Sequence, residues 1–270
     1  MRLGIGSFTY PWAVGIPGNP PDRPLDAFGI LDKARSLGLK LAQFGDNLPL
    51  SALSLTDSAK LARQAEDSGM TLELGTRGIE PDHLLGELDL AVKLKSRILR
   101  VVVDKHPFEP SPEEVVSILR TVLPRFTHAN VVLAIENHDR FTSGVLADIV
   151  RKLNSPYVGI CLDTVNSFGA LEGPEVVVKN LGPLAVNLHI KDFAITRSRS
   201  QLGFSVTGAA AGARRLNVPW LLKELKDMGR DPNAIIELWT PFGDSLSQTI
   251  QTEERWAKES VEYLRTLIKG

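Results

Sequence analysis

Four side chains that could bind a divalent metal ion each stand at or near the end of an apolar run in the sequence. They are Glu136 in VVLAIE, Asp163 in YVGICLD, His189 in AVNLHIKD and Glu237 in AIIE. Each run is typical of a buried strand, and parallel strands place their C-terminal ends on one side of a sheet. Three carboxylates and one imidazole on that side would form an oxygen-rich ligand set, which suits Mn²⁺ or Mg²⁺ and is compatible with Co²⁺ or Zn²⁺.

A carboxylate at a strand end also has an ordinary structural role, because a single Glu or Asp there often caps the next helix. The spacing of the four residues argues for a shared role instead. Successive members are 27, 26 and 48 residues apart, which places each of them one strand further along the chain. A buried carboxylate without a partner is strongly unfavourable, so a bound cation is the most economical explanation. We expect one divalent ion, with Mn²⁺ as the first choice.

The strands that would position these residues belong to a pattern that covers the whole chain. Short apolar runs alternate with amphipathic segments such as PLDAFGILDKARSLG, DSAKLARQAEDSG and VPWLLKELKDMG, several of which end at a glycine, as helices commonly do. One helix start is well defined, because Ser111 precedes a proline and two glutamates, the pattern of a capped N-terminus. Eight apolar runs are found, at residues 2–8, 39–44, 70–75, 97–103, 131–137, 157–163, 184–192 and 234–239.

Eight strands, each followed by a helix, predict a (β/α)8 TIM barrel, because right-handed crossovers bring the last strand back to the first. The 270 residues, of which 43% are hydrophobic, suffice for one large core, so we expect a single domain over residues 1–270. The alternative is an open doubly wound sheet, which would normally carry a glycine-rich phosphate loop after its first strand. The segment TYPWAVGIPGNPPDRP stands there instead and predicts an irregular loop over the barrel mouth.

A second long loop is expected from residue 193 to about residue 218, after the seventh run. Its motif TGAAAGARR has the glycine content of a phosphate-binding loop. No apolar run directly precedes the motif, and it lacks the lysine followed by serine or threonine that ends a P-loop. We therefore expect a flexible lid in preference to a phosphate cradle.

Charge and cysteine content limit the classes of partner. The formal net charge is −1, with 31 basic and 32 acidic residues, so no overall field would attract nucleic acid or anionic membranes. Cys161 is the only cysteine, which excludes an intramolecular disulfide and a cysteine-based zinc site and favours a reducing compartment. The opening MRLGIGSFTYPW is too short and too polar for a signal peptide. We expect a cytoplasmic protein without a membrane span, and a homo-oligomer is compatible with the sequence.

The motifs at the strand ends resemble those of a known family. E-N-H closes the fifth run, L-D-T the sixth, H-I-K-D lies in the seventh and I-E in the eighth, as in the xylose isomerase-like TIM barrel superfamily of sugar phosphate isomerases and epimerases. The resemblance implies that Glu136, Asp163, His189 and Glu237 bind one divalent ion. It also implies that Glu136 and Glu237 are the two acid/base residues of an isomerase or epimerase, which acts on a small sugar or hydroxy-keto acid through a metal-stabilised enediolate.

This double role is chemically reasonable. A metal that binds neighbouring carbonyl and hydroxyl oxygens polarises the carbonyl and stabilises the enediolate that forms when a C–H proton leaves. Glu136 and Glu237 belong to strands that are separated by two others. They could therefore approach the substrate from different sides, one removing the proton and the other returning it.

Two further polar residues could contact the substrate of such an enzyme. Several ketose epimerases of the family have a substrate-binding histidine three residues after the sixth-strand aspartate, whereas this chain has Asn166, so ketose specificity does not carry over directly. Asn166 could bind substrate, or serve as a helix cap or turn residue. Lys191 lies two residues after His189 and would point to the same side of the strand. It could neutralise a substrate carboxylate, or form an ion pair with Asp192.

Other candidate substrate-binding groups follow the third, fourth and fifth runs. Arg77 in GTRG and Lys105 in VDKHP could hold an acidic or phosphorylated substrate, or could be solvated surface charges. His138 follows Glu136 by two residues, and it could contact substrate, orient that carboxylate or begin a helix. Aromatic residues near the first and last runs could form an apolar wall of the site or pack at the barrel rim. They are Tyr10, Trp12, Trp239 and Phe242.

A second reaction of the same chemistry remains open. GIGSFTYPWAVG, FGDNLPL and TGAAAGARRLNVPWL resemble the 3-oxo-isoapionate decarboxylases, in which loss of carbon dioxide leaves the same enediolate. The alternative function is therefore a metal-dependent decarboxylase, a lyase, that acts on a branched 3-oxo sugar acid. It would need one acid instead of two, and a cation such as Lys191, Arg77 or Lys105 would orient the substrate carboxylate.

Two other function classes fit the sequence less well. Endonuclease IV, a DNA-repair enzyme of the superfamily, has a zinc cluster that needs histidines at the ends of the second and third strands, where this chain has QFGD and LGTRG. A non-catalytic sugar-binding barrel would keep the convergent ligands without using them. We therefore expect an enzyme of carbohydrate metabolism with a small sugar or sugar-acid substrate, and neither a nucleic-acid nor a membrane partner.

Overall fold

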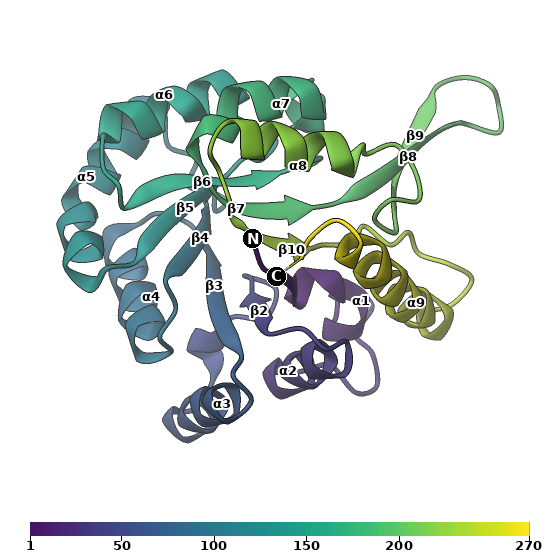
Figure 1. Cartoon of the computed structure of the whole chain (residues 1–270), viewed down its shortest axis with the longest axis horizontal. Helices are drawn as coiled ribbons and strands as arrows, with labels where there is room; N and C mark the ends of the chain where they lie inside the picture. The colour runs from purple at the N-terminus through teal and green to yellow at the C-terminus, as the bar shows by residue number, and fades with distance from the viewer. Residues whose placement is uncertain (270) are drawn as a thin grey trace.

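The alternating pattern of the sequence forms a ring of eight parallel strands with helices outside it in the computed structural model, which describes residues 1–269 (Figure 1). The strands follow the order β1-β10-β7-β6-β5-β4-β3-β2, and β1 pairs with β2 to close the ring. The predicted (β/α)8 barrel is thereby confirmed. Its strands are β1 (Leu3–Gly6), β2 (Leu41–Phe44), β3 (Thr71–Arg77), β4 (Ile98–Val102), β5 (Val132–Glu136), β6 (Val158–Asp163), β7 (Ala185–Ile190) and β10 (Asn233–Ile236).

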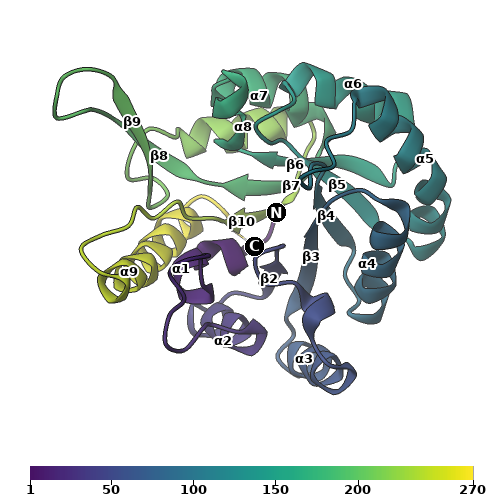
Figure 2. The same cartoon turned by 180° about the vertical axis from the view of Figure 1, so that it is seen from behind.

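Helices connect the strands and cover the outside of the ring, as Figures 1 and 2 show from opposite sides. The crossover segments that the sequence predicted as amphipathic are all helical. The α-helices are α1 (Pro11–Val14), α2 (Ala27–Ser36), α3 (Leu55–Asp67), α4 (Pro81–Lys93), α5 (Pro112–Ala129), α6 (Ser143–Leu153), α7 (Pro174–Leu181), α8 (Val218–Asp227) and α9 (Leu246–Arg265).

The start of α5 has the capped geometry that its sequence predicts. Ser111 Oγ accepts a hydrogen bond from the backbone N–H of Glu114 at 3.3 Å, and the Glu114 carboxylate accepts one from the backbone N–H of Ser111 at 2.7 Å. Pro112 occupies the first helical position, where its missing N–H is not needed. The reciprocal bonds satisfy two donors that would otherwise lack a partner at the helix end.

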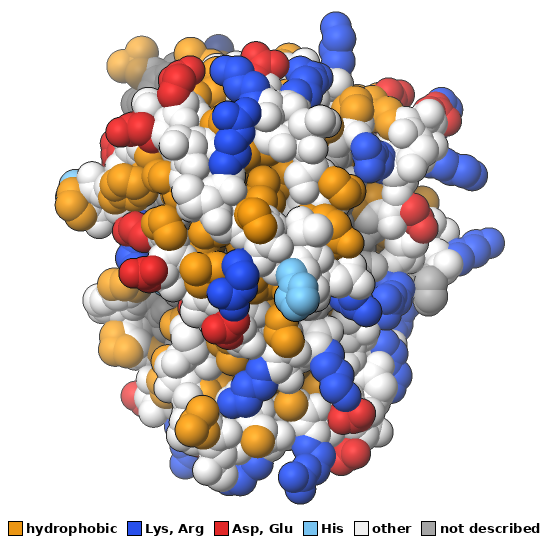
Figure 3. Space-filling view, turned by 90° about the vertical axis from the view of Figure 1, so that its left-hand side faces the viewer, with side chains coloured by type: hydrophobic (Ala, Val, Ile, Leu, Met, Phe, Trp, Pro, Cys, Tyr) orange, Lys and Arg blue, Asp and Glu red, His pale blue; other side chains and the backbone are white. Residues whose placement is uncertain are grey.

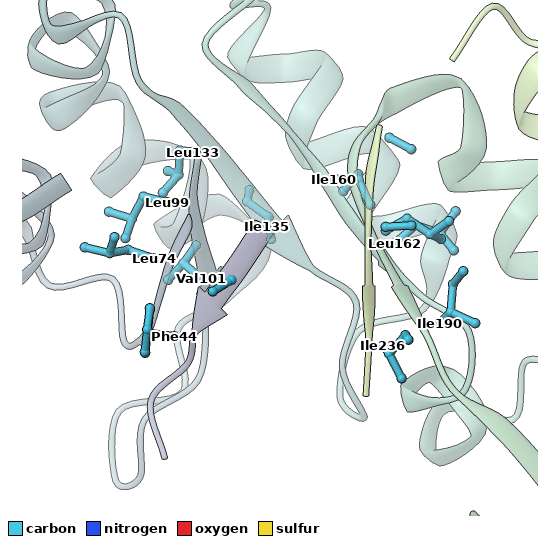
Figure 4. Packing of buried hydrophobic residues seen from close by; sticks show 14 of the residues in the cluster. Phe44, Leu74, Leu99, Val101, Leu133, Ile135, Ile160, Leu162, Ile190 and Ile236 are labelled. Carbon is cyan, nitrogen blue, oxygen red and sulfur yellow. The ribbon is translucent and has the colours of Figure 1, made fainter. Parts of the chain in front are cut away.

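The two faces of the strands differ in composition. Aliphatic and aromatic side chains form one large hydrophobic cluster, part of which Figure 4 shows with Phe44, Leu99 and Ile135 among the labelled residues. The interior of the barrel holds polar side chains instead. Asn187 of β7 donates to Glu73 of β3 at 2.8 Å, and because these strands are not neighbours in the ring, this bond crosses the interior. Asn187 and Glu73 were not predicted as interior polar groups, because each stands within a run that is apolar overall.

The segment after β7, expected from the sequence to be a long loop serving as a flexible lid, has regular secondary structure. It contains an antiparallel pair of strands, β8 (Asp192–Arg197) and β9 (Phe204–Ala209), which extends away from the barrel (Figures 1 and 2). β-Branched residues at facing positions, Ile195 and Val206, favour this pairing. Gly203 takes a positive φ of 98° before β9, a conformation that glycine adopts readily.

The glycine-rich motif of this segment is built differently from a phosphate cradle. Its first residues belong to β9, which corrects the expectation that no strand precedes it. The backbone N–H groups of Arg214 and Leu216 donate to the carboxylate of Asp192 at 2.8 and 2.9 Å, and that of Ala211 donates to Ser260 Oγ at 2.9 Å. These donors therefore bind the protein itself and are not free to bind a phosphate.

The surface agrees with a net charge near zero. On the side of the molecule that carries α4 and α5, basic and acidic side chains are interspersed, with small apolar areas between them (Figure 3). Within residues 1–269, no helix is both long enough and apolar enough to cross a membrane.

Candidate metal centre

The structure brings the four sequence-predicted ligands together at the C-terminal end of the barrel. Glu136 and Asp163 are the last residues of β5 and β6, His189 is the next-to-last residue of β7, and Glu237 follows β10 directly. All four side chains are buried. His189 Nδ1 lies 3.1 Å from Glu237 Oε1, 3.4 Å from Glu136 Oε2 and 3.8 Å from Asp163 Oδ2. One imidazole nitrogen thus faces three carboxylates.

The separations from His189 Nδ1 fit ligands of a single ion. Ligand atoms of Asp163, His189 and Glu237 all lie within 4.8 Å of one another, whereas Glu136 forms such a group with His189 and Cys161. Two ligand atoms that each lie about 2.1 Å from a divalent ion are roughly 3.0 Å apart at a right angle and roughly 4.2 Å apart when opposite. The three distances from His189 Nδ1 fall in this interval. Within the described chain, His189 Nδ1 is buried without a hydrogen-bond partner, and Asp163 Oδ2 has the Lys191 ammonium 2.8 Å away. A buried imidazole nitrogen normally has a partner, so the position of His189 Nδ1 among carboxylates favours a cation between them.

The composition of the ligand set can be narrowed further. Cys161 also lies close enough to Glu136 and His189 to form a metal-binding group with them. Burial, however, raises the pKa of the Cys161 thiol to about 12, so the sulfur keeps its proton. The thiol lies 3.4 Å from Asn187 Oδ1, to which it donates. Because only a thiolate is an effective ligand, the set with three carboxylates and His189 is the better donor set.

Arg100 of β4 is a member of the site that the sequence analysis missed. Its Nε donates to Glu136 Oε2, and its Nη1 contacts Asp46 Oδ1 at 2.8 Å. Burial tends to raise the pKa of Glu136, but the charge of Arg100 outweighs it and holds that pKa well below its usual range. The available signal was a charged residue in the middle of the apolar run RILRVVV, where only an interior partner could compensate its burial.

Lys191 and Asn166 lie beside the ligand cluster. Lys191 Nζ lies 2.8 Å from both Asp163 Oδ2 and Glu237 Oε2, and it donates to Asn166 Oδ1 at 3.1 Å. Asn166 Nδ2 in turn donates to Glu136 Oε1 at 2.7 Å. Burial tends to lower the pKa of Lys191, but these carboxylates raise it above its usual value, so the ammonium stays charged.

The alternative ion pair of Lys191 with Asp192 is not the one that forms. Successive residues of an extended chain point in opposite directions, so Asp192 faces away from the site. There its carboxylate accepts backbone N–H groups, including that of Phe193 at 2.7 Å. Asn166 does not cap a long helix either, because its side chain bonds to Glu136 and Lys191.

Charge in the cluster favours an additional cation. Three carboxylates face two fixed cations, Arg100 and Lys191. Burial would lower the pKa of His189, yet the carboxylates of Glu237 and Glu136 raise it well above 6.5. Burial raises the pKa of Asp163, and the charges of Glu136 and Glu237 raise it further. The carboxylates thus outnumber the fixed cations around one point, which favours the binding of a further cation.

A cavity of about 450 Å³ opens above the ligand cluster. Its polar wall includes Glu136 and Glu237, and its apolar wall includes Trp12 and Trp239. Trp12 packs against Phe242 with ring centroids 5.1 Å apart, so the first and last segments of the chain meet here as predicted. Tyr10 is buried and does not line this cavity. The cations that line it are Arg77, Arg100 and Lys191.

The remaining candidate substrate-binding residues separate into two groups. Arg77 lines the cavity and pairs with Asp46 at 2.9 Å, and His138 lines the cavity with its Nδ1 3.3 Å from Asp139. Lys105 is exposed and does not line it. Lys105 belongs to a tight turn that bridges back to Phe108.

The histidines do not gather into a multi-metal cluster. Of the five in the sequence, His189 is the one found in a potential metal-binding group within residues 1–269. His83 instead lies 2.8 Å from Thr76 Oγ1 on the helix side of β3. A zinc cluster of the endonuclease IV type would need several histidines around one point, so the site has a different composition.

Comparison with known proteins identifies relatives over nearly the whole chain. The family described as "Xylose isomerase-like TIM barrel" matches residues 31–267. The 3-oxo-isoapionate decarboxylase of Pectobacterium atrosepticum is 33% identical over 266 residues, which is 98% of this chain and 96% of that protein.

Solved structures show the same fold at lower identity. The D-psicose 3-epimerase of Clostridium cellulolyticum H10, solved with D-tagatose, superposes with a TM-score of 0.74 at 16% identity and covers 98% of this chain and 99% of its own. A xylose isomerase-like barrel from Mycobacterium smegmatis in complex with magnesium has a TM-score of 0.67 at 14% identity, covering 97% of each chain.

Proposed function

The chain belongs to the xylose isomerase-like TIM barrel family, and we propose that it is a divalent-metal-dependent decarboxylase of a branched 3-oxo sugar acid. The single structural observation that carries this choice is the engagement of Glu136. Its Oε2 accepts from Arg100 and its Oε1 accepts from Asn166 at 2.7 Å. The sequence identity of 33% to a 3-oxo-isoapionate decarboxylase supports the same reaction.

Fixed donors on both oxygens of Glu136 favour chemistry that needs one acid. An epimerase moves a proton off one face of the substrate and returns one on the other face, so it needs two titrating groups. The Arg100 guanidinium favours the charged form of Glu136, which makes Glu136 a poor group for proton transfer. Decarboxylation removes carbon dioxide in place of the first proton and therefore requires one proton donor.

We propose that Glu136, Asp163, His189 and Glu237 hold one divalent ion, and that the ion is Mn²⁺. The position of the buried His189 Nδ1 among carboxylates and the carboxylate-rich composition support this assignment. Such an ion would supply Lewis-acid stabilisation of the negative charge that develops on substrate oxygens when a bond to carbon breaks.

The side chains of this chain account for the other steps. Lys191 is a buried cation that lines the cavity, and it would bind and orient the substrate carboxylate. When the carbon–carbon bond to that carboxylate breaks, its electron pair moves toward the neighbouring carbonyl and carbon dioxide leaves. Glu237 also lines the cavity, and its ammonium partner at 2.8 Å is Lys191, the group that would turn to the substrate carboxylate. Glu237 would then donate the proton that completes the product.

The rest of the cavity suits a small polyol. Trp12 and Trp239 provide an apolar wall against which the carbon chain of a sugar acid can pack. Arg77 and His138 offer hydrogen-bond donors at the opening, where the hydroxyl groups of a branched substrate would reach them. A cavity of about 450 Å³ is within the size range of sites for small molecules.

An isomerase or epimerase of small sugars or hydroxy-keto acids is the second candidate. It is favoured by the presence of two cavity-lining carboxylates, Glu136 and Glu237, on strands that are not neighbours in the ring. In that function both would transfer protons, and Arg100 would have to release Glu136 during turnover.

One experiment separates these functions. The protein loaded with Mn²⁺ is incubated in D₂O with branched 3-oxo sugar acids, ketoses and hydroxypyruvate, and both carbon dioxide release and deuterium uptake are followed by NMR. A decarboxylase releases carbon dioxide and places one deuterium at the carbon that lost it. An isomerase or epimerase incorporates deuterium without gas.

The Glu237→Gln protein and the unaltered protein stripped of metal serve as controls. Carbon dioxide release that is equally fast in either control would contradict the proposed role of the centre. Deuterium exchange into ketoses with no gas from any acid would replace the proposal by the epimerase function, and no turnover across the panel would favour a binding protein.

A further inference from the structure

We infer that Gln43 and Glu73, inside the barrel below the metal centre, fix the tautomer of His189 so that its Nδ1 lone pair points at the metal. The inference rests on the metal centre of the proposed function. Gln43 belongs to β2, Glu73 to β3 and His189 to β7. Neither Gln43 nor Glu73 was singled out from the sequence, because each stands within an apolar run and not at its end.

The first contact is between His189 and Gln43. His189 Nε2 lies 2.7 Å from Gln43 Oε1, across the interior between β7 and β2, which are not neighbours in the ring. An amide oxygen only accepts hydrogen bonds, so His189 Nε2 must carry the proton. In neutral imidazole the other nitrogen, Nδ1, is then a free acceptor, and it faces Glu136, Asp163 and Glu237.

The second contact decides which way the Gln43 amide points. Gln43 Nε2 donates to Glu73 Oε2 at 3.1 Å and to Asn187 Oδ1 at 3.0 Å. A turn of the amide by half a revolution would bring its oxygen against the Glu73 carboxylate and its NH₂ group against His189. The first of these would place two acceptors together in a buried site, which is unfavourable. The oxygen of Gln43 is therefore directed at His189.

The Glu73 side chain is held in place by hydrogen bonds from both sides. It is buried, and three side-chain amides donate to it. Asn233 Nδ2 donates to Oε1 at 2.7 Å, while Asn187 Nδ2, at 2.8 Å, and Gln43 share Oε2. Burial raises the pKa of Glu73, and the hydrogen bonds from the three amides oppose that shift. Every hydrogen-bond contact to Glu73 comes from an N–H donor, which both carboxylate oxygens can accept. Because Glu73 accepts a hydrogen bond from Gln43 Nε2, the amide oxygen of Gln43 points at His189 and fixes which imidazole nitrogen carries the proton.

Gln43 and Glu73 are thus positioning residues that act on the metal through His189. Partners of this kind typically contribute a factor of about 10–100 to metal affinity. The variant Gln43→Met keeps the length of the side chain and removes both hydrogen bonds. The exchange Gln43→Glu with Glu73→Gln reverses the pair: Glu at position 43 still accepts from His189, and the amide at position 73 supplies a donor to it.

The test uses the full chain loaded with Zn²⁺, which is diamagnetic. The ¹⁵N spectrum of the imidazole groups reports which nitrogen of His189 carries a proton, and a His189→Asn protein identifies its signals. Calorimetry gives the Zn²⁺ dissociation constant. We expect one tautomer with a proton on Nε2 in the unaltered protein. In Gln43→Met the dissociation constant should rise about 10–100-fold. The Nε2 proton of the zinc-bound imidazole should then exchange rapidly with water, so that its signal is lost, because its acceptor is gone. The exchanged pair should restore both.

Thr76→Val is the matched control. Thr76 lies on the same strand as Glu73, but its hydroxyl contacts His83 outside the barrel, so loss of that bond should leave Zn²⁺ binding unchanged. A Gln43→Met protein that is folded, binds Zn²⁺ within about twofold of the original and keeps the Nε2 proton would overturn the inference. Failure of the unaltered protein to bind any divalent ion would instead remove the metal centre on which the inference rests.

Discussion

Arg100 of β4 and Glu136 of β5 form a buried ion pair at the mouth of the barrel, and the same guanidinium contacts Asp46 at 2.8 Å. Asp46 lies in the loop after β2 and also pairs with Arg77 at 2.9 Å. Arg100 thus links Glu136, a proposed metal ligand, to the loop after β2 that carries Asp46. It also determines the state of that ligand, because the charge of Arg100 keeps Glu136 ionised.

Replacement of Arg100 should therefore destabilise the metal-free protein strongly. In Arg100→Met the carboxylate of Glu136 loses its buried partner, and the loss of one member of such a pair costs about 3–5 kcal/mol. The free energy of unfolding in urea, measured without metal, should fall by this amount. Mn²⁺ should recover part of it, since the ion supplies positive charge to the same carboxylate.

Arg125→Met provides the comparison for this measurement. Arg125 pairs with Asp89 at 3.5 Å between exposed side chains, so its removal should cost at most about 1 kcal/mol, with or without Mn²⁺. An Arg100→Met protein as stable as Arg125→Met in the absence of metal would show that the buried pair does not balance charge as described.

The second prediction concerns Glu136 and Glu237 themselves. Either change, Glu136→Gln or Glu237→Gln, should lower turnover at least about a hundredfold, which corresponds to roughly 2.7 kcal/mol of transition-state stabilisation. Both should bind the divalent ion more weakly, because each loses a charged oxygen. Circular dichroism and urea unfolding should show that the barrel remains folded. Near-normal turnover in both variants would exclude the proposed roles of Glu136 as a metal ligand and of Glu237 as the proton donor.

The convergence of the four proposed ligands was predictable from the sequence, because each interrupts or follows an apolar run at the same relative place. Glu136 and Asp163 end their strands, and parallel strands in a closed barrel bring their ends to one rim. The eight-strand barrel followed from the same count of runs. This part of the prediction needed only local pattern and a rule for how strands are connected.

The interior contacts could not be predicted in this way. Arg100 meets Glu136, and Gln43 meets His189 across the ring, only because of the strand register and the order of the strands. The hairpin of β8 and β9 was missed for a related reason, since its apolar residues are few and the segment resembles a loop in composition. Lys191 was correctly placed near the site, but its partners, Asp163 and Glu237, are distant in sequence.

Removal of the Lys191 charge should affect metal and substrate in opposite directions. Lys191 Nζ lies 2.8 Å from oxygens of both Asp163 and Glu237, so in the absence of metal the ammonium occupies part of the coordination environment. In Lys191→Met the dissociation constant for Mn²⁺ should fall by about tenfold, as expected when a competing charge is removed. The KM for an acidic substrate should rise by about 10–100-fold, because a charge-assisted hydrogen bond is lost.

Lys223→Met, on the exposed face of α8, changes the net charge equally and should move neither quantity. Calorimetry with Mn²⁺ and initial rates over a range of substrate concentration give the two values. A Lys191→Met protein in which metal binding weakens would show that Lys191 supports the centre, and an unchanged KM would remove its role in binding the carboxylate.

The last prediction concerns pH and Glu253 of α9, a buried carboxylate outside the metal centre. Its oxygens accept the backbone N–H groups of Trp12 at 2.8 Å and Ala13 at 3.0 Å, which holds α1 against α9. Burial raises the pKa of Glu253 from 4.5 to about 7, although the two N–H donors oppose the shift. The folded protein therefore keeps this proton over a range of pH in which the unfolded chain has already released it.

Stability should accordingly decrease as pH rises through this range. The folded state binds more protons than the unfolded state between pH 4.5 and about 7, so the free energy of unfolding falls with increasing pH there. The fall from this group is about 2 kcal/mol between about pH 5.5 and about pH 8. Glu253→Gln cannot titrate and should lose that part of the slope, even if the changed contacts with Trp12 lower its stability at every pH. Parallel urea-unfolding profiles for the two proteins across this range would mean that Glu253 ionises near its ordinary pKa.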